Sequence, residues 1–175
     1  NKHVLINNQG EVEIEYRKRY LKGFADFGET AIYKKGPEII QTADTPYGKI
    51  GVSICRDMEF SSYARQAGQK DVDIMLNSSL DYPKSEGPIN SLRAIENGFS
   101  LVRPVYNGYS YAVDYNGRVV AHMDSDETET GIMYADVLTK GVKTIYTAIG
   151  NLLGWLCVLG LFGCIALTII LPRKT

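Results

Sequence analysis

Apolar and polar positions along the chain fall into short alternating or continuous runs, and these runs predict a strand-rich structure. Residues 11–16 alternate with a period of two, so valine, isoleucine and tyrosine share one strand face while three glutamates form a solvated face. The apolar runs 49–55 and 72–77 predict buried strands, and residues 59–69 and 89–99 predict helices. Strands with interposed helices indicate an α/β fold with sheet and helix layers.

The remaining short runs add strands and turns to this pattern. Asn107-Gly108 predicts a turn, and Asn116-Gly117 predicts a hairpin with a type I′ turn. In the second helix, Leu92, Ile95 and Phe99 share one face. Residues 24–35 lack periodicity and predict a loop. The further predicted strands are 3–7, 39–42, 101–106, 109–114, 118–123 and 132–137.

The chain changes character at its C-terminal end. Residues 148–171 contain no charged side chain, and a helix of that length extends about 36 Å, enough to cross a hydrocarbon core of about 30 Å. We therefore predict a transmembrane helix. The predicted organisation is a globular part at residues 1–140, a linker at 141–147, the helix at 148–171 and a short basic tail at 172–175.

Charges around this helix bear on its orientation. Arg173 and Lys174 favour a cytoplasmic C-terminus, although Lys140 and Lys143 at the other end weaken the asymmetry. We expect a membrane location, with the globular part outside the cytoplasm of a bacterial inner membrane. The net charge of −1 argues against a nucleic-acid partner.

Cys55 is the candidate nucleophile of the chain. It ends an apolar run and is followed at once by Arg56 and Asp57, whereas Cys157 and Cys164 lie in the uncharged terminal segment. A thiol reacts as the thiolate, which neighbouring positive charge favours. The alternative is that Cys55 is a small buried apolar residue. No cluster of histidine and cysteine has the spacing of a metal site.

Three separated segments together resemble the nitrilase, or carbon–nitrogen hydrolase, superfamily. Tyr16-Arg-Lys-Arg-Tyr-Leu21 resembles the segment that carries its catalytic lysine, and Gly51-Val-Ser-Ile-Cys-Arg-Asp57 resembles its nucleophile segment. Arg93-Ala-Ile-Glu-Asn97, with Arg103 after it, is similar to the helix and strand that follow. Within the superfamily the chain is similar to the apolipoprotein N-acyltransferase family, which also ends in a membrane helix.

The resemblance implies a fold and a catalytic set. The fold is an αββα sandwich, of which this chain would form the C-terminal portion, followed by the membrane helix. Cys55 would be the nucleophile and Lys18 the catalytic lysine, and no cofactor or metal is implied. The general-base glutamate of the family lies upstream of the region covered here. We therefore expect the chain to be part of a longer protein and to be inactive alone.

Three acidic residues are implied as supporting groups. A glutamate follows the lysine of the acyltransferases in a Phe-Gly-Glu context, which Glu29 matches, whereas Asp26 fits the spacing. Asp57 lies two residues after the cysteine, where support of the lysine or cysteine loop is expected. Glu96 matches a glutamate on the family's helix, with either a direct role or an ion pair that positions the helix.

Three functions remain open. The first is a membrane-anchored N-acyltransferase that passes an acyl chain from a phospholipid donor, through a thioester on Cys55, to the amine of a lipoprotein. The second is a membrane-tethered amidase or nitrilase that passes a small amide through the same thioester to water. The segment Asn77-Ser-Ser-Leu-Asp-Tyr-Pro83 favours it, because the acyltransferases have a more aromatic segment there. The third is a catalytically incomplete binding module.

Overall fold

The computed structural model describes residues 1–24, 27–84, 89–127 and 131–170. A two-stranded antiparallel sheet is formed by β1 (Lys2–Ile6) and β2 (Val12–Arg17). A six-stranded sheet has the order β3-β4-β5-β6-β7-β8. Its strands are Gln41–Thr45, Gly48–Ile54, Ile74–Tyr82, Ser100–Arg103, Val105–Val113 and Val119–Asp124.

The centre of the larger sheet is parallel and its edges are antiparallel. Strands β4, β5 and β6 run parallel, with Val52 opposite Leu76 and Leu76 opposite Val102. Their connections carry the helices α2 (Ser61–Gln69) and α3 (Ser91–Asn97), as expected for parallel strands. Since parallel strands end at a common edge, the residues that follow β4, β5 and β6 come together there.

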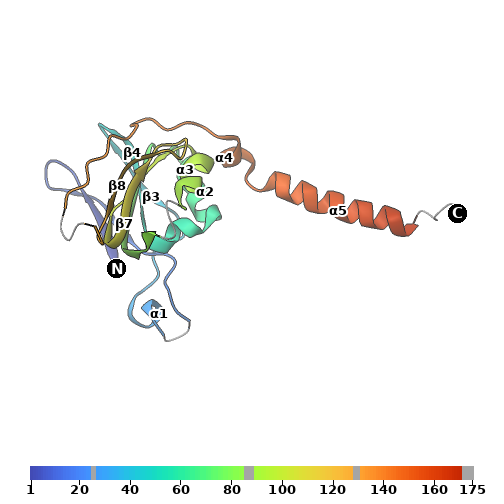
Figure 1. Ribbon diagram of the computed structural model, residues 1–175, viewed down its shortest axis with the longest axis horizontal. Coiled ribbons are helices and arrows are strands. Elements are labelled where there is room, and N and C mark those ends of the chain that lie inside the picture. Colours follow the sequence, from blue (N-terminus) through green and yellow to red (C-terminus); the bar gives the residue numbers. More distant parts are fainter. Residues whose placement is uncertain (25–26, 85–88, 128–130, 171–175) are drawn as a thin grey trace.

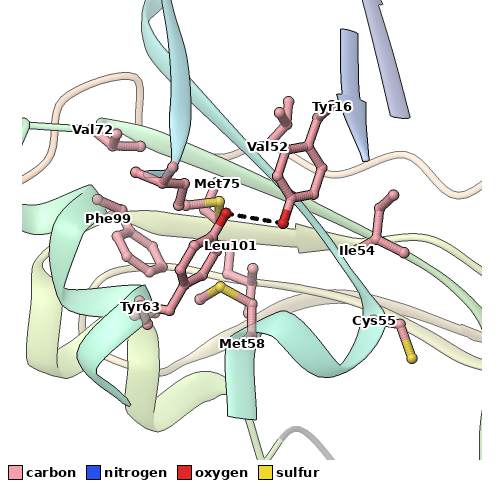
Figure 2. Close-up of a cluster of buried hydrophobic side chains, with 14 of the residues drawn as sticks. Tyr16, Val52, Ile54, Cys55, Met58, Tyr63, Val72, Met75, Phe99 and Leu101 are labelled. Atoms are coloured by element: carbon pink, nitrogen blue, oxygen red, sulfur yellow. Dashed lines mark hydrogen bonds between the residues drawn. The ribbon is translucent and has the colours of Figure 1, made fainter. Parts of the chain in front are cut away.

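The hydrophobic core lies between the larger sheet, the two helices and the small sheet. Figure 2 shows Tyr63 of α2 and Phe99 beside Met75 of β5, while Tyr16 of β2 lies over Val52 of β4. Tyr63, which is buried within this cluster, donates a hydrogen bond of 2.9 Å to the hydroxyl of Tyr16. Fully burying one large apolar side chain contributes about 1.5–3 kcal/mol relative to leaving it exposed, so this cluster accounts for much of the stability.

The C-terminal helix projects from this globular part (Figure 1). It comprises α5 (Leu152–Ile170), and α4 (Ile145–Ile149) precedes it. The prediction of one continuous helix from residue 148 was wrong, because Gly150 has a positive φ of 57° and separates α4 from α5. Residues Leu152–Ile169 are the one stretch of the described chain that is long and apolar enough to cross a membrane.

The linker before α5 is bonded to the globular part. Arg65 of α2 donates hydrogen bonds of 3.1 and 3.0 Å to the carbonyl of Thr147 and of 2.8 Å to that of Ala148. The backbone N–H of Val142 donates to the carbonyl of Gly98 at 2.7 Å. A Cβ atom at Gly98 would lie 1.8 Å from the Val142 oxygen, so only glycine allows this approach.

Several predicted elements differ from the structure. Asn107-Gly108 lies inside the span of β7, yet the chain reverses there as predicted: residues 105–108 pair in parallel with β5, whereas residues 111–113 pair antiparallel with β6. The hairpin at Asn116-Gly117 is present between β7 and β8, but only Gly117 has a positive φ, so the turn is not type I′. Residues 132–137 form no strand.

The loop at 24–35 and the helix at 89–99 also need correction. The loop contains a short helix, α1 (Glu29–Ile32), on a segment that extends away from the sheet (Figure 1). In α3, Leu92 and Ile95 are exposed and Ala94 is buried, so the predicted apolar face is not the packed one. The neighbouring Asn97 is also buried, because the small face of α3 packs against α2.

Candidate active site

Cys55 lies where β4 gives way to a 3₁₀ turn, Cys55–Glu59, at the edge where the parallel strands end. Its side chain is 8% exposed and lies at the margin of the core cluster, apart from Met58 and Tyr63 (Figure 2). Its φ of 51° is left-handed, a conformation that costs a residue with a side chain roughly 1–2 kcal/mol. A strained backbone at a strand end is a feature of functional sites.

Lys18 follows β2 directly and is buried, with 2% exposure. Its ammonium donates a hydrogen bond of 2.6 Å to Oε2 of Glu29, forming an ion pair. A buried ammonium needs such a partner, because desolvation of an unpaired charge is costly. The lysine is thereby held in one place between β2 and the loop that carries α1.

Glu29 is fixed by three donors. Besides Lys18, the backbone N–H of Lys22 donates to Oε2 at 2.6 Å, and the amide of Asn1 donates to Oε1 at 2.7 Å. Burial alone would raise the pKa of Glu29, but the hydrogen bonds from Lys18 and Lys22 outweigh it and hold the pKa below the usual value. Glu29 is therefore a carboxylate at neutral pH. Asp26, the alternative by spacing, lies outside the described residues.

Cys55, Lys18 and Glu29 all line one cavity of about 470 Å³. The lining also includes Leu80 and Asp81 at the end of β5. The complete lining is Asn1, Lys18, Lys22, Glu29, Tyr33, Ile54, Cys55, Leu80 and Asp81. A thiol, an ammonium and a carboxylate on one cavity wall can perform nucleophilic attack on a carbonyl group, with the cation stabilising the oxyanion.

Asp57 joins the cysteine turn to the lysine segment. Its Oδ1 accepts from the backbone N–H groups of Arg19 and Tyr20 at 3.1 and 2.8 Å. Its Oδ2 accepts from the N–H of Ile54 at 3.0 Å and from the hydroxyl of Tyr16 at 2.6 Å. Burial raises the pKa of Asp57, and these hydrogen bonds oppose the rise. The carboxyl group thus ties the residues beside Lys18 to the residue before Cys55.

Glu96 is placed differently from the other four predicted residues. It is partly exposed on α3, forms an ion pair with Arg93 one turn earlier, and is not among the residues that line the cavity. Its backbone carbonyl accepts a hydrogen bond from the hydroxyl of Thr144, which precedes α4. This placement favours a role in helix and linker packing over direct chemistry.

Sequence reasoning gave no site role to two buried polar residues beside the cysteine. Asn77 of β5 donates to the Cys55 carbonyl at 3.3 Å, and Arg103 at the end of β6 donates to the same oxygen at 3.3 Å. The usable signal was topological: Cys55 follows β4 and Arg103 ends β6, and Asn77 lies on β5 between these two parallel strands, opposite Ser53.

The chain belongs to the carbon–nitrogen hydrolase family, whose model matches residues 1–146. This assignment agrees with the resemblance drawn from the lysine and cysteine segments. Members of the family that are similar to the chain include both amidases and acyltransferases.

Three relatives illustrate that range. Human deaminated glutathione amidase is 32% identical over 146 residues, covering 69% of this chain and 43% of the relative. Apolipoprotein N-acyltransferase of Rickettsia bellii is 34% identical over 114 residues, covering 59% and 22%. The omega-amidase of Saccharomyces cerevisiae is 28% identical over 169 residues, covering 85% and 56%. The chain thus spans less than half the length of the deaminated glutathione amidases that it matches.

Solved structures confirm the fold. An amidase from Nesterenkonia sp. AN1 superposes with a TM-score of 0.65 at 23% identity, covering 76% of this chain and 55% of that one. In one structure of that amidase, acrylamide is added to the active-site cysteine. The α/β arrangement of the present chain is therefore that of a nitrilase-like domain.

Proposed function

We propose that the chain acts in a membrane-anchored N-acyltransferase, with Cys55 as nucleophile. The observation that carries the proposal is the cavity wall shared by the Cys55 thiol and the buried Lys18–Glu29 ion pair. The apolar α5 and the acyltransferases among the relatives support a membrane substrate. Residues 152–170 would span the bilayer, with the globular part on its outer side.

The reaction would proceed in two displacements. The Cys55 thiolate attacks the ester carbonyl of a phospholipid; a C–S bond forms, the C–O bond breaks, and the leaving alkoxide takes a proton. The amine of a lipoprotein then attacks the thioester: a C–N bond forms, the C–S bond breaks with Cys55 leaving as the thiolate, and the proton lost by the amine passes to solvent. Lys18 faces the same cavity, where its ammonium would stabilise each oxyanion. Glu29 would orient that ammonium, and Asp57 would hold the two segments together.

An amidase is the second candidate, and the relatives give it a specific basis. The human deaminated glutathione amidase and the yeast omega-amidase match 69% and 85% of this chain, against 59% and 68% for the two Rickettsia acyltransferases. The end of β5 contributes Leu80 and Asp81 to the cavity, and the only aromatic residue of the segment 77–83 is Tyr82. In this alternative the same thioester forms from a small amide, and water accepts the acyl group.

Intact-protein mass spectrometry separates the two candidates. After incubation with phospholipid vesicles, the acyltransferase should gain a fatty-acyl mass on Cys55, which Cys55→Ala must lack. Cys55→Ala should also lose turnover and keep its fold, because the deleted atom is small and lies at the edge of the core. An adduct formed from small amides but not from phospholipid would favour the amidase. Full activity in Cys55→Ala would refute both.

The membrane anchor is tested separately. The full chain should remain in the membrane pellet after carbonate extraction, because α5 buries none of its apolar surface in the protein. Extraction without detergent would contradict the anchor and leave the nucleophile assignment standing.

A further inference from the structure

Arg103 is a buried cation without a carboxylate partner. Its side chain is 2% exposed, and none of the ion pairs in the described part of the chain involves it. Its Nε has no hydrogen-bond partner, and its guanidinium lies 4.2 Å from the centre of the Tyr82 ring. Burying a charge in this way is costly, so such a residue calls for an explanation beyond stability.

The hydrogen bonds of Arg103 converge on the nucleophile segment. Nη1 donates to the carbonyl of Cys55 at 3.3 Å and to Oδ1 of Asn77, while Nη2 donates to the hydroxyl of Ser79 at 3.5 Å. Asn77 in turn donates from Nδ2 to the same Cys55 carbonyl at 3.3 Å, and to the hydroxyl of Ser53 at 2.8 Å. The Cys55 carbonyl therefore accepts from two side chains that also bond to each other.

This carbonyl belongs to a residue in the left-handed region. Cys55 and Asp71 are the only residues other than glycine with positive φ in the described chain, and such a conformation persists only where its surroundings fix it. Two donors on the carbonyl oxygen fix the peptide plane that follows Cys55. Fixing that plane also fixes the direction of the Cα–Cβ bond that carries the thiol.

We infer that Arg103 and Asn77 are positioning residues for the nucleophile: they hold the Cys55 carbonyl and thereby aim the thiol at the cavity. The inference rests on the proposed function, in which Cys55 is the attacking group. Neither residue lines the cavity, so both act through Cys55 and not on substrate. A role in joining the strands alone would be served by apolar side chains, without a buried unpaired charge.

Two substitutions each remove a hydrogen-bond donor to the Cys55 carbonyl with little change in side-chain volume. Asn77→Asp keeps an acceptor for Arg103 but replaces the amide group that donates to the Cys55 carbonyl. Arg103→Met keeps an apolar chain of similar length and removes both donors. Arg103→Lys keeps the charge and can restore a single bond, so it should recover part of what Arg103→Met loses. Leu101→Ala is the control, since Leu101 is equally buried on the same strand and makes no bond to Cys55.

The measurements use the complete protein in detergent, with Cys157→Ala and Cys164→Ala so that Cys55 is the only thiol of this region. Alkylation of Cys55 by iodoacetamide and its acylation by a p-nitrophenyl ester are followed by mass spectrometry, well below the unfolding midpoint of each variant. We expect Asn77→Asp and Arg103→Met to slow acylation about 10²-fold, the usual cost of misplacing a reacting group. Alkylation should slow severalfold. Leu101→Ala should lower the midpoint and leave both rates unchanged.

Two results would overturn the inference. The first is wild-type acylation and alkylation rates in both Asn77→Asp and Arg103→Met. The second is an equal slowing in Leu101→Ala, because the effect would then be one of stability. Failure of the proposed function has a different signature, because wild-type Cys55 would then be alkylated but not acylated. The alkylation rates would still decide whether Arg103 and Asn77 position the thiol.

Discussion

The two halves of the candidate site are built in different ways. The cysteine half lies at the end of the parallel strands, where Cys55 is surrounded by buried side chains and its carbonyl is held by Asn77 and Arg103. The lysine half depends on a loop: Lys18 is buried, but its partner Glu29 lies on a segment that extends from the domain (Figure 1). Phe27, two residues before Glu29, is 79% exposed.

Because of this difference, substitutions in the two halves should affect folding stability and catalysis to different extents. On the cysteine side, polar groups are fixed by the core, so substitutions there should cost folding free energy as well as activity. On the loop side, Glu29 is held by hydrogen bonds at the surface of the domain, so substitutions there should affect the chemistry more than the fold. Asp57 bonds to both sides and should show both effects.

The largest effect is expected at Lys18. Lys18→Met removes the cation on the cavity wall, and loss of an oxyanion donor typically costs about 10²–10³-fold in kcat. Steady-state kinetics of the proposed acyl transfer would measure it. Lys22→Met is the matched control, because the Lys22 side chain lines the same cavity but its contact with Glu29 uses the backbone N–H. Equal losses in both variants would contradict the assignment of Lys18.

Asp57→Asn should be the most damaging of these changes to the fold. The substitution places an amide NH₂ group among four donors, which leaves buried groups unsatisfied at a cost of about 3 kcal/mol. Urea denaturation would measure the loss in the free energy of unfolding. Asp44→Asn, at an exposed carboxylate of β3, should change stability little. An Asp57→Asn variant as stable as the wild type would show that the two segments are held by other contacts.

Glu29→Gln should give a smaller and pH-dependent effect. The folded pKa of Glu29 is lowered, so the Lys18–Glu29 pair stabilises the fold above the ordinary glutamate pKa of 4.5 and this stabilisation is lost as pH falls through the folded pKa. The wild type should exceed Glu29→Gln by about 1 kcal/mol at neutral pH. The difference should vanish in acid. Urea titrations at several pH values would test this, and a difference that grew toward acid would have the wrong sign.

Phe27→Ser should have the smallest effect on stability. The side chain is exposed, and the hydrogen bonds of this residue are made by its backbone N–H and carbonyl groups. The free energy of unfolding should change by less than about 0.5 kcal/mol. Leu101→Ala in the core, measured under the same conditions, should lose several times more. A large loss in the free energy of unfolding of Phe27→Ser would mean that the loop carrying α1 contributes to the stability of the core.

Local patterns and the family resemblance predicted much of the site. The cysteine at a strand end, the lysine after β2 and the Phe-Gly-Glu glutamate do line one cavity, as expected of a common site. Their catalytic roles remain proposals. The hydrogen bonds from Asn77 and Arg103 to the Cys55 carbonyl were not predicted. They depend on which strands are neighbours in the sheet, and the local sequence pattern does not contain strand order.

Errors in the predicted fold had similar causes. The turn predicted at Asn107-Gly108 is present, but it is a bend inside β7 and not a break between two strands, because residues 105–108 pair with β5 and Gly108 packs closely against the backbone of Tyr82. Leu92 and Ile95 look like a buried face, but α3 packs through its small residues instead. Tertiary packing decided both cases, and a single sequence shows packing partners only indirectly.

The bonds from Arg65 to the end of α4 limit the rotational freedom of the proposed enzyme at the bilayer. A domain on a loose tether samples many orientations, and only a fraction of them present its cavity to the lipid. Here α5 begins four residues after the Ala148 carbonyl, which Arg65 holds, so the domain and its anchor should tumble as one body. The rate of encounter with an ester in the same membrane would then depend on lateral diffusion and the tilt of one helix, and not on the length of a linker.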